Sequence, residues 1–435
     1  MRMSLCWETR GFDFTFIWKM HIRGNEGSED EPDLTIRRIG RNYGNNESKE
    51  EVNNEEEIGE EGLNYSDSDL LPFVMKWAWR LSFDASPTFS GLLKKLSVVF
   101  LIGFLAWVYQ AIQPPAPKIC GSPGGPSVTA PRIKLSDGRH LAYKENGVPR
   151  DKAKYKIIWV HGSRSCRHDV MQLSPKLTEE LGIYLLSFDR AGYGESDPNP
   201  KRTVKSTALD IEELADQLEL GSKFYVIGVS MGGQIVWTCL KYIPHRLAET
   251  ALVAPVVNYW WPGFPTNLTR EAYKHQPLRD QWTLRVAHYT PWLTYWWNTQ
   301  RWFPASSVVT NSPEILSKNM NIIFSLTITL LSISSFHAQV RQQGEFESLF
   351  RDFIIGFRDW EFASMELENP FQHNEYSVHL WQGDEDRLVP VTLQRYIAEK
   401  LPWVHYHELI GSGHMFYYLD GMNEAIVEAL LLGEK

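Results

Sequence analysis

The pentapeptide Gly228-Val229-Ser230-Met231-Gly232 decides the fold of this chain. It follows a short apolar run, Phe224 to Ile227, and it leads into a segment, Gln234 to Tyr242, with the composition of a helix. A strand, a sharp turn with a serine at its apex and a helix together form the setting of a nucleophilic serine. The flanking glycines let neighbouring backbone approach the turn closely. Alone the pattern is weak, because chance supplies it roughly once in seven chains of this length.

Apolar runs typical of buried strands recur on both sides of the pentapeptide: Lys156–Val160, Leu185–Phe188, Thr250–Ala254, Val378–Trp381 and Val404–His407. Two further short runs, Arg132–Leu135 and His140–Tyr143, flank Ser136-Asp137-Gly138 and predict a hairpin. Helical periodicity follows from Val204 to Leu218, and the stretch from Asn423 to Leu432 reads as a closing helix. Strands alternating with helices predict an α/β fold with a mostly parallel sheet, flanking helices and a site along the carboxyl edge of the strands.

Residues 256–376 are too many for a connection between strands, and they predict an inserted helical cap over that edge. Trp260 and Trp261 open this cap and are expected to line an apolar substrate passage. The alternative for most of its tryptophans is that they build the core of the cap or rest on a bilayer. The uncharged run from Asn321 to Phe336 has no helical periodicity. A local insertion is favoured there over a second membrane span, and a translated intron stays open.

The first 131 residues differ from the rest of the chain. Residues 1–90 are predicted to be disordered, since residues 26–69 contain 15 acidic and four basic residues and few apolar ones; a solvated acidic helix is the alternative for Asn45 to Glu61. Residues 91–113 are predicted to be a transmembrane anchor: Leu96 to Ile112 is uncharged and is about 25 Å long as a helix. A buried core helix is the alternative. Residues 114–131, rich in Pro, Gly and Ser, are predicted to be a linker to the domain 132–435.

Charge and cysteine spacing exclude several classes of function. A net charge of −9 argues against a nucleic-acid partner. The four cysteines are far apart, so a disulfide framework or zinc site is not expected. We predict no metal and no cofactor. Basic residues are commoner before the anchor than after it, which predicts a single-pass membrane protein with a luminal or extracellular domain and membrane lipid as a partner.

Acidic residues and a histidine follow the last two strands. Gly383 to Pro390 contains Asp384 and Asp386, and Gly411-Ser412-Gly413-His414 follows the next strand. A serine needs a neighbouring base to remove its proton, and the base needs a third group to orient it. Since the carboxyl ends of parallel strands meet at one edge, these residues are expected near Ser230 in the chain order serine, acid, histidine.

The chain resembles α/β-hydrolases of the large esterase and epoxide-hydrolase-like group, and in particular plant membrane-tethered members of uncertain substrate. The resemblance covers residues 132–435. It rests on five motifs in order, namely His161-Gly162, Asp189-Arg190-Ala191-Gly192-Tyr193-Gly194-Glu195-Ser196, the pentapeptide, Gly383 to Pro390 and Gly411 to His414. Ala191 stands where members often have proline. Ser230 argues against epoxide hydrolysis, which uses aspartate at that position.

The resemblance implies Ser230 as nucleophile, Asp386 as acid and His414 as base, with an oxyanion hole from the backbone amides of Met231 and Ser163. It prefers Asp386 to Asp384, which is then a solvated loop charge; His405 and His407 are expected to be structural or surface residues. Substrate contacts are expected from His161, Gly162, Trp260 and Trp261. The expected activity is hydrolysis of an ester or related acyl bond of a small apolar molecule or lipid. The alternatives are acyl transfer to another acceptor, or ligand binding without catalysis.

Overall fold

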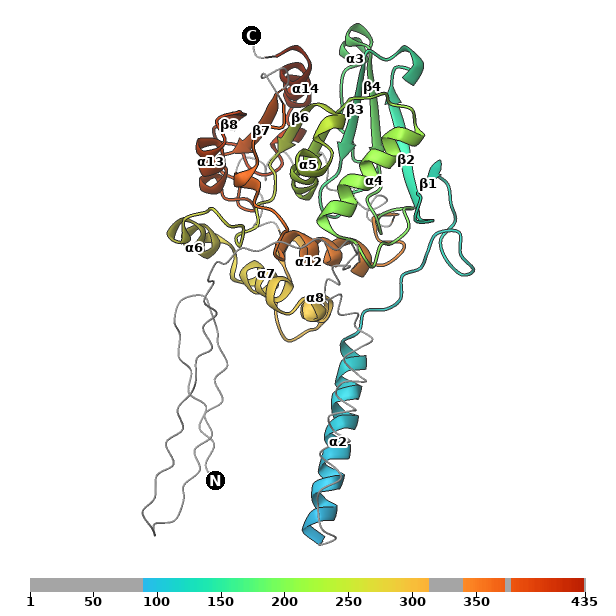
Figure 1. Cartoon of the computed structure of the whole chain (residues 1–435), viewed down its shortest axis with the longest axis vertical. Coiled ribbons are helices and arrows are strands. Elements are labelled where there is room, and N and C mark those ends of the chain that lie inside the picture. Colours follow the sequence, from blue (N-terminus) through green and yellow to red (C-terminus); the bar gives the residue numbers. More distant parts are fainter. Residues whose placement is uncertain (1–88, 313–338, 372–376, 434–435) are drawn as a thin grey trace, which may run out of the picture. The chain divides into compact units, whose positions relative to one another are not determined.

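The computed structural model describes residues 89–312, 339–371 and 377–433. The predictions for residues 1–88 and for Asn321–Phe336 lie outside these ranges. Within them the chain folds around one eight-stranded sheet, with cap helices gathered beyond one of its edges (Figure 1).

The sheet has the order β1-β2-β4-β3-β5-β6-β7-β8. Its strands are β1 (Arg132–Lys134), β2 (His140–Gly147), β3 (Tyr155–Val160), β4 (Ile183–Phe188), β5 (Phe224–Val229), β6 (Leu247–Val253), β7 (Val378–Gly383) and β8 (Val404–Leu409). The β1–β2 and β2–β4 pairs are antiparallel, and every other pair is parallel. The predicted hairpin, the predicted strands and the mostly parallel sheet are therefore confirmed.

Both faces of the sheet are covered by helices, and side chains alternate between two cores. In β3, Ile158 and Val160 join one core, while Ile157 and Trp159 join the other. The first core also receives the apolar faces of α4 (Val204–Gln217), α5 (Met231–Tyr242) and α13 (Val391–Lys400). The second receives α14 (Met422–Leu432) and Leu181 of α3 (Pro175–Leu181). Coverage on both faces explains why the central strands read as unbroken apolar runs.

Local sequence sets where the flanking helices begin and end. Thr203 and Ser206 form a reciprocal capping box at the start of α4. Ser174 caps α3 and Gly182 ends it in a left-handed conformation, with φ 67°. The helix α5 begins at Met231, three residues earlier than its composition suggests. Gly232 and Gly233 occupy its first turn because backbone from β3 and the side chain of Pro255 pack where their Cβ atoms would be.

The cap is built from short helices between β6 and β7: α6 (Thr266–His275), α7 (Leu278–Tyr289), α8 (Thr294–Thr299), α9 (Ser307–Thr310) and α12 (Arg351–Phe357), with a π-helical turn η5 (Phe346–Phe350) and 3-10 turns η3 (Pro291–Leu293) and η6 (Ser364–Glu366). Further 3-10 turns, η1 (Arg150–Lys152), η2 (Pro244–Arg246) and η8 (Phe416–Tyr418), lie in loops elsewhere. Figure 1 shows α6, α7, α8 and α12 together at the end of the sheet. The inserted helical cap is thus confirmed within the described residues.

One helix of the described chain, α2 (Phe89–Ile112), is long and apolar enough to cross a membrane. Its apolar part, Gly91–Ile112, has a mean hydropathy of 1.8, and only 6% of it is buried. The low burial is inconsistent with the alternative of a buried core helix. A membrane-spanning role agrees with its length and composition.

Candidate active site

The backbone of Ser230 is held in a conformation that few residues adopt. Ser230 stands between β5 and α5 with φ 54° and ψ −117°. The turn is tight: a Cβ atom on Gly228 would lie 2.3 Å from the Gly232 carbonyl oxygen, and one on Gly232 would lie 2.1 Å from that of Val160. Only glycine fits at these two positions, so the pentapeptide forms the sharp strand–turn–helix that its sequence predicts.

Three side chains from different loops meet at this turn. The Oγ atom of Ser230 lies 3.0 Å from Nε2 of His414, and Nδ1 of His414 lies 2.7 Å from Oδ2 of Asp386. Asp386 follows β7 and His414 follows β8, so two neighbouring parallel strands deliver them to the carboxyl edge of the sheet. Both side chains are buried. The structure therefore brings together the three residues that the sequence singles out.

Hydrogen bonds fix the carboxylate of Asp386. Its Oδ1 accepts from the backbone N–H groups of Leu388 (2.8 Å) and Val389 (2.9 Å). Its Oδ2 accepts from Nε2 of Gln382 (2.9 Å). These donors fix the carboxylate with Oδ2 directed at His414, which holds the imidazole with Nε2 toward the serine.

Asp384 has a different role from the solvated loop charge that the sequence suggests. Its Oδ1 accepts from the backbone N–H groups of Gly411 (2.7 Å) and Ser412 (3.3 Å), so it clamps the loop that carries His414 onto the end of β7. A Cβ atom on Gly383 would lie 2.3 Å from the carbonyl oxygen of Ser412, which shows how closely the two loops approach.

His405 and His407 lie on β8, away from the serine. His407 stacks on Trp381 with a centroid separation of 3.8 Å and bonds His379 (2.9 Å), and His405 is exposed. This agrees with their expected structural or surface character.

His161 is buried, and both of its ring nitrogens bond backbone atoms. Its Nε2 accepts from the backbone N–H of Arg190 (3.1 Å), so the proton is on Nδ1, which donates to the carbonyl oxygen of Gly162 (2.7 Å). Burial, followed by the charge of Arg190, lowers the pKa of His161 well below its usual range, in accord with this neutral form. These contacts give His161 a structural role beside Gly162, and a substrate contact from this residue stays a prediction.

Gly162 lies directly against the serine. A Cβ atom there would lie 3.1 Å from Cβ of Ser230. The Gly162 carbonyl also accepts from Nη2 of Arg190 (2.9 Å). Because C=O and N–H point in opposite directions across a trans peptide, fixing this carbonyl on Arg190 and His161 also fixes the N–H of Ser163 on the other side of the peptide.

A buried ionic cluster connects this loop to the cap. The guanidinium of Arg190 binds both carboxylate oxygens of Asp352 in α12, at 2.8 and 2.6 Å, and Asp352 also accepts from Arg202 (2.9 Å) and Tyr193 (2.6 Å). Two arginines share one aspartate in a site almost without solvent exposure. A cavity of about 30 Å³ lies beside them and is lined also by Met231 and Gln234.

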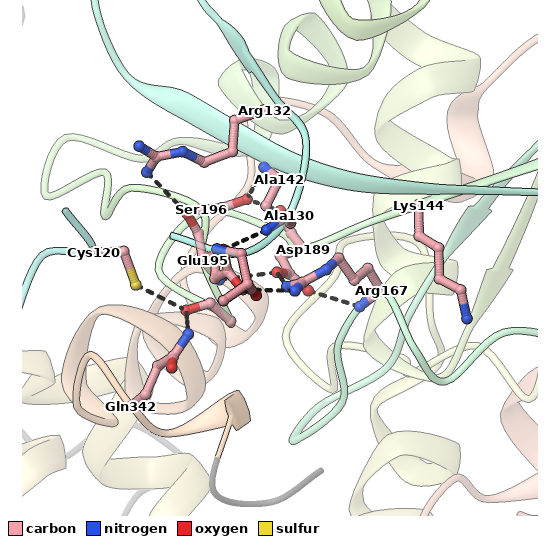
Figure 2. A network of polar contacts seen from close by, with 12 residues as sticks. Cys120, Ala130, Arg132, Ala142, Lys144, Arg167, Asp189, Glu195, Ser196 and Gln342 are labelled. Atoms are coloured by element: carbon pink, nitrogen blue, oxygen red, sulfur yellow. Dashed lines mark hydrogen bonds and ion pairs between the residues drawn. The ribbon is translucent and has the colours of Figure 1, made fainter. Parts of the chain in front are cut away.

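A second polar network ties the linker to the sheet edge (Figure 2). Arg167 bridges Asp189 and Glu195, with 2.7 Å to Oε1 of Glu195. Glu195 accepts from the backbone N–H groups of Thr129 (2.7 Å) and Ala130 (2.9 Å). Burial alone would raise the pKa of Glu195, but these hydrogen bonds and the charge of Arg167 outweigh it and lower the pKa to about 2. The motif from Asp189 to Ser196 is therefore held together by structural contacts.

Trp260 and Trp261 pack within the cap. Trp260 stacks on His288 at 4.2 Å between centroids and donates to the hydroxyl of Tyr289 (3.1 Å). Trp261 is buried against Trp360. Neither lines the cavity beside Met231. Their contacts match the alternative of a cap core.

In the residues that the structure describes, no group of three or more His, Cys, Asp or Glu side chains could hold a metal ion.

A sequence profile described as "Alpha/beta hydrolase family" matches residues 157–429, more than half of the chain. The chain belongs to the alpha/beta hydrolase family. Its fold and the strand–turn–helix at Ser230 agree with that membership, and hydrolysis is the general activity that the membership supports. The match includes every residue of the serine, aspartate and histidine cluster.

Solved structures of similar fold include three bacterial enzymes. The hydrolase is 16% identical to an esterase from Exiguobacterium antarcticum (69% of this chain, 99% of the other, TM-score 0.48) and 19% identical to a thermophilic esterase from Thermogutta terrifontis (70% and 100%, TM-score 0.46). It is 15% identical to the enol-lactonase from Burkholderia xenovorans LB400 (68% and 98%, TM-score 0.47).

The sequence did not single out the residues that join the site to the cap. Arg190 and Tyr193 belong to a motif that the sequence analysis quotes, and Asp352 belongs to none of the motifs. A signal existed, because Asp352 stands in the largely apolar segment Phe350–Phe357, and a charge in such a run needs a buried partner.

Proposed function

We propose that this hydrolase is a membrane-anchored serine hydrolase that cleaves an ester or related acyl bond of an apolar small molecule or lipid. The observation that carries the proposal is the continuous hydrogen-bonded relay from Asp386 through His414 to Ser230. A buried carboxylate, an oriented imidazole and a serine at a strained turn are the parts that acyl transfer through a covalent intermediate requires.

In the proposed reaction, Nε2 of His414 removes the proton from Ser230 as Oγ attacks the acyl carbonyl carbon. The imidazolium that forms is stabilised by Asp386. It then gives its proton to the leaving alcohol as the carbon–oxygen bond breaks and an acyl-serine remains. Water attacks this acyl-serine with His414 again as base, which releases the acid and restores the serine.

The N–H groups of Met231 and Ser163 are proposed to bind the oxyanion. Met231 is the first residue of α5, where backbone N–H groups have no acceptor within the helix, and the helix dipole favours negative charge at that end. The N–H of Ser163 belongs to the peptide whose carbonyl is held by His161 and Arg190. Two such donors lower the barrier by several kcal/mol.

Anchoring by α2 is supported by its apolar length of 22 residues and by its low burial. A luminal or extracellular side for the catalytic domain is the orientation that the flanking lysines, Lys94 and Lys95, favour.

A burst experiment tests the covalent mechanism. The full-length protein in detergent is mixed with a p-nitrophenyl ester, and we expect a rapid release of one p-nitrophenolate per protein followed by slower turnover. Mass spectrometry of the acid-quenched protein should find the acyl group on the peptide with Ser230. Added alcohols that take up the acyl group faster than water would indicate acyl transfer, and ester binding without any release of p-nitrophenolate would indicate a binding protein.

A further inference from the structure

The cap has an exposed aromatic surface formed by α7, η3, α8 and the turn after α8. Its members, which we call the aromatic cap surface, are Leu278, Trp282, Tyr289, Trp292, Trp302 and Phe303. Trp302 is 80% exposed. Ring contacts link some of its members: Trp297 lies between Trp282 (5.9 Å between centroids) and Phe303 (4.8 Å), and Trp302 contacts Trp296 at 6.1 Å. Exposed aromatic groups of this size mark an interaction site.

The exposed charges within the segment that carries this surface are positive. Residues 277–310 contain three arginines, Arg279, Arg285 and Arg301, and a single acid, Asp280. Asp280 is buried and accepts from Oγ of Ser306 (2.7 Å), so it adds no negative charge to the surface. The guanidinium of Arg285 lies over the Trp282 ring at 5.3 Å from its centroid. A segment that combines tryptophan and arginine, with no exposed acid of its own, is typical of protein surfaces that meet lipid headgroups.

The chain between α2 and the cap is short. After Ile112, the next residue fixed to the cap is Lys118, whose backbone N–H donates to the carbonyl of Gln343 (2.9 Å). Cys120 then donates to the Gln343 side chain (3.2 Å). Five residues, 113–117, separate the end of α2 from this attachment, and three of them are proline. A proline-rich segment rises about 3.1 Å per residue, so the attachment lies within about 20 Å of the end of α2.

The attachment is also close to the aromatic cap surface. Gln343 lies three residues before the start of η5, and Phe346 and Phe350 of η5 contact the Tyr295 ring of α8 at 6.1 and 5.5 Å. Tyr295 is followed by Trp296, the ring partner of Trp302. The short tether therefore keeps this side of the cap near the membrane whenever α2 spans it.

We propose that the aromatic cap surface lies in the headgroup region of the bilayer that α2 spans. The proposal rests on the membrane anchoring included in the proposed function. Lipid is the occupant that the observations favour, because the tether keeps bilayer at high local concentration beside the surface and the three arginines match lipid phosphates. An acyl substrate dissolved in the bilayer would then meet the cap before it meets water.

Lipid-dependent quenching tests the proposal on the full-length protein. Cys6 is changed to serine, the buried Cys120, Cys166 and Cys239 are kept, and one cysteine is introduced by Trp302→Cys or Trp292→Cys for labelling with bimane. The matched control is Lys223→Cys, at an exposed position before β5 on the opposite edge of the sheet. Each protein is reconstituted into nanodiscs of phosphatidylcholine and phosphatidylserine, with or without a doxyl-labelled lipid.

We expect the doxyl lipid to reduce bimane fluorescence at positions 302 and 292 at least twofold and to leave position 223 unchanged. If the doxyl lipid reduced the fluorescence at positions 302 and 292 no more than at position 223, the proposal would be overturned. Label self-quenching that appears only in discs with two copies would also overturn it, since this would assign the surface to a second copy of the chain. Co-elution of the protein with the discs reports anchoring separately, so failure of the anchor and failure of the cap contact are distinguished.

Discussion

Arg190 and Asp352 form a two-point ion pair that joins the carboxyl end of β4 to the cap helix α12. The two N–O distances are 2.8 and 2.6 Å, and both side chains are almost fully buried. Nη2 of Arg190 also holds the carbonyl of Gly162, the residue that lies against Ser230. One arginine thus connects the cap to the peptide beside the serine.

Loss of this carboxylate should destabilise the fold strongly. Asp352→Asn would leave two buried guanidinium groups, Arg190 and Arg202, without their counter-ion, and we expect the free energy of unfolding to fall by about 3–5 kcal/mol. Urea unfolding in detergent measures this. Arg395→Gln is the control, because it breaks an exposed pair with Glu408 and should cost at most about 1 kcal/mol. Equal losses in the two variants would contradict a special role for the buried cluster.

The two aspartates after β7 should differ sharply in their effect on activity. Asp386→Asn keeps an oxygen acceptor for Leu388 and Val389 but removes the charge beside His414, so we expect kcat to fall by about 10⁴-fold. Asp384→Asn keeps the acceptor for the histidine loop and should lower kcat by less than about tenfold. The measurement is ester hydrolysis at equal folded concentration. If both variants lose activity to the same extent, the choice between the two acids is wrong.

The strain at the turn predicts an unusual stability effect. Ser230 has a positive φ that glycine tolerates and that costs other residues about 1–3 kcal/mol. We expect Ser230→Gly to be more stable than Ser230→Ala by about 1 kcal/mol, although both are inactive. Thermal unfolding of the two variants and the wild type gives the comparison. A less stable glycine variant would show that the turn is not strained.

The Glu195 network should make stability depend on acid pH. A pKa of about 2 in the folded chain lies below the ordinary value of 4.5, so Glu195 stabilises the fold above pH 4.5, and this contribution is lost as the pH falls towards 2. The shift corresponds to about 3 kcal/mol. Glu195→Gln should therefore be less stable than wild type at pH 7, with a gap that narrows below pH 4.5. The exposed Glu428→Gln serves as control and should follow the wild type at every pH.

Much of the fold could be predicted because its signals are local. Each central strand is an apolar run buried on both faces, and the glycines of the pentapeptide mark the turn directly. The helix α3 could not be found in this way, since none of its residues is fully buried and no apolar period results. The sequence predicts a later start for α5 because Gly232 and Gly233 are typical of loops, and only their packing against β3 and Pro255 explains them inside a helix.

The sequence predicts the site residues that directly follow strands. It does not predict the residues that come into contact only when the cap folds over the sheet. Ser230, Asp386 and His414 each come after a strand, so topology alone brings them together. Asp352 and Arg190 are 162 positions apart in the sequence, and their pairing depends on how the cap folds back over the sheet. The motif of His161 predicts a substrate contact, and in the structure both of its ring nitrogens form hydrogen bonds with backbone atoms of Gly162 and Arg190.

Labelling with a fluorophosphonate probe tests the central claim most directly. The probe forms a covalent bond with a serine only when a neighbouring base activates it. We expect the folded full-length protein to incorporate one probe per chain, on Ser230, and Ser230→Ala to incorporate none. A folded wild-type protein that stays unlabelled, or a Ser230→Ala variant that is labelled to the same extent, would contradict the account.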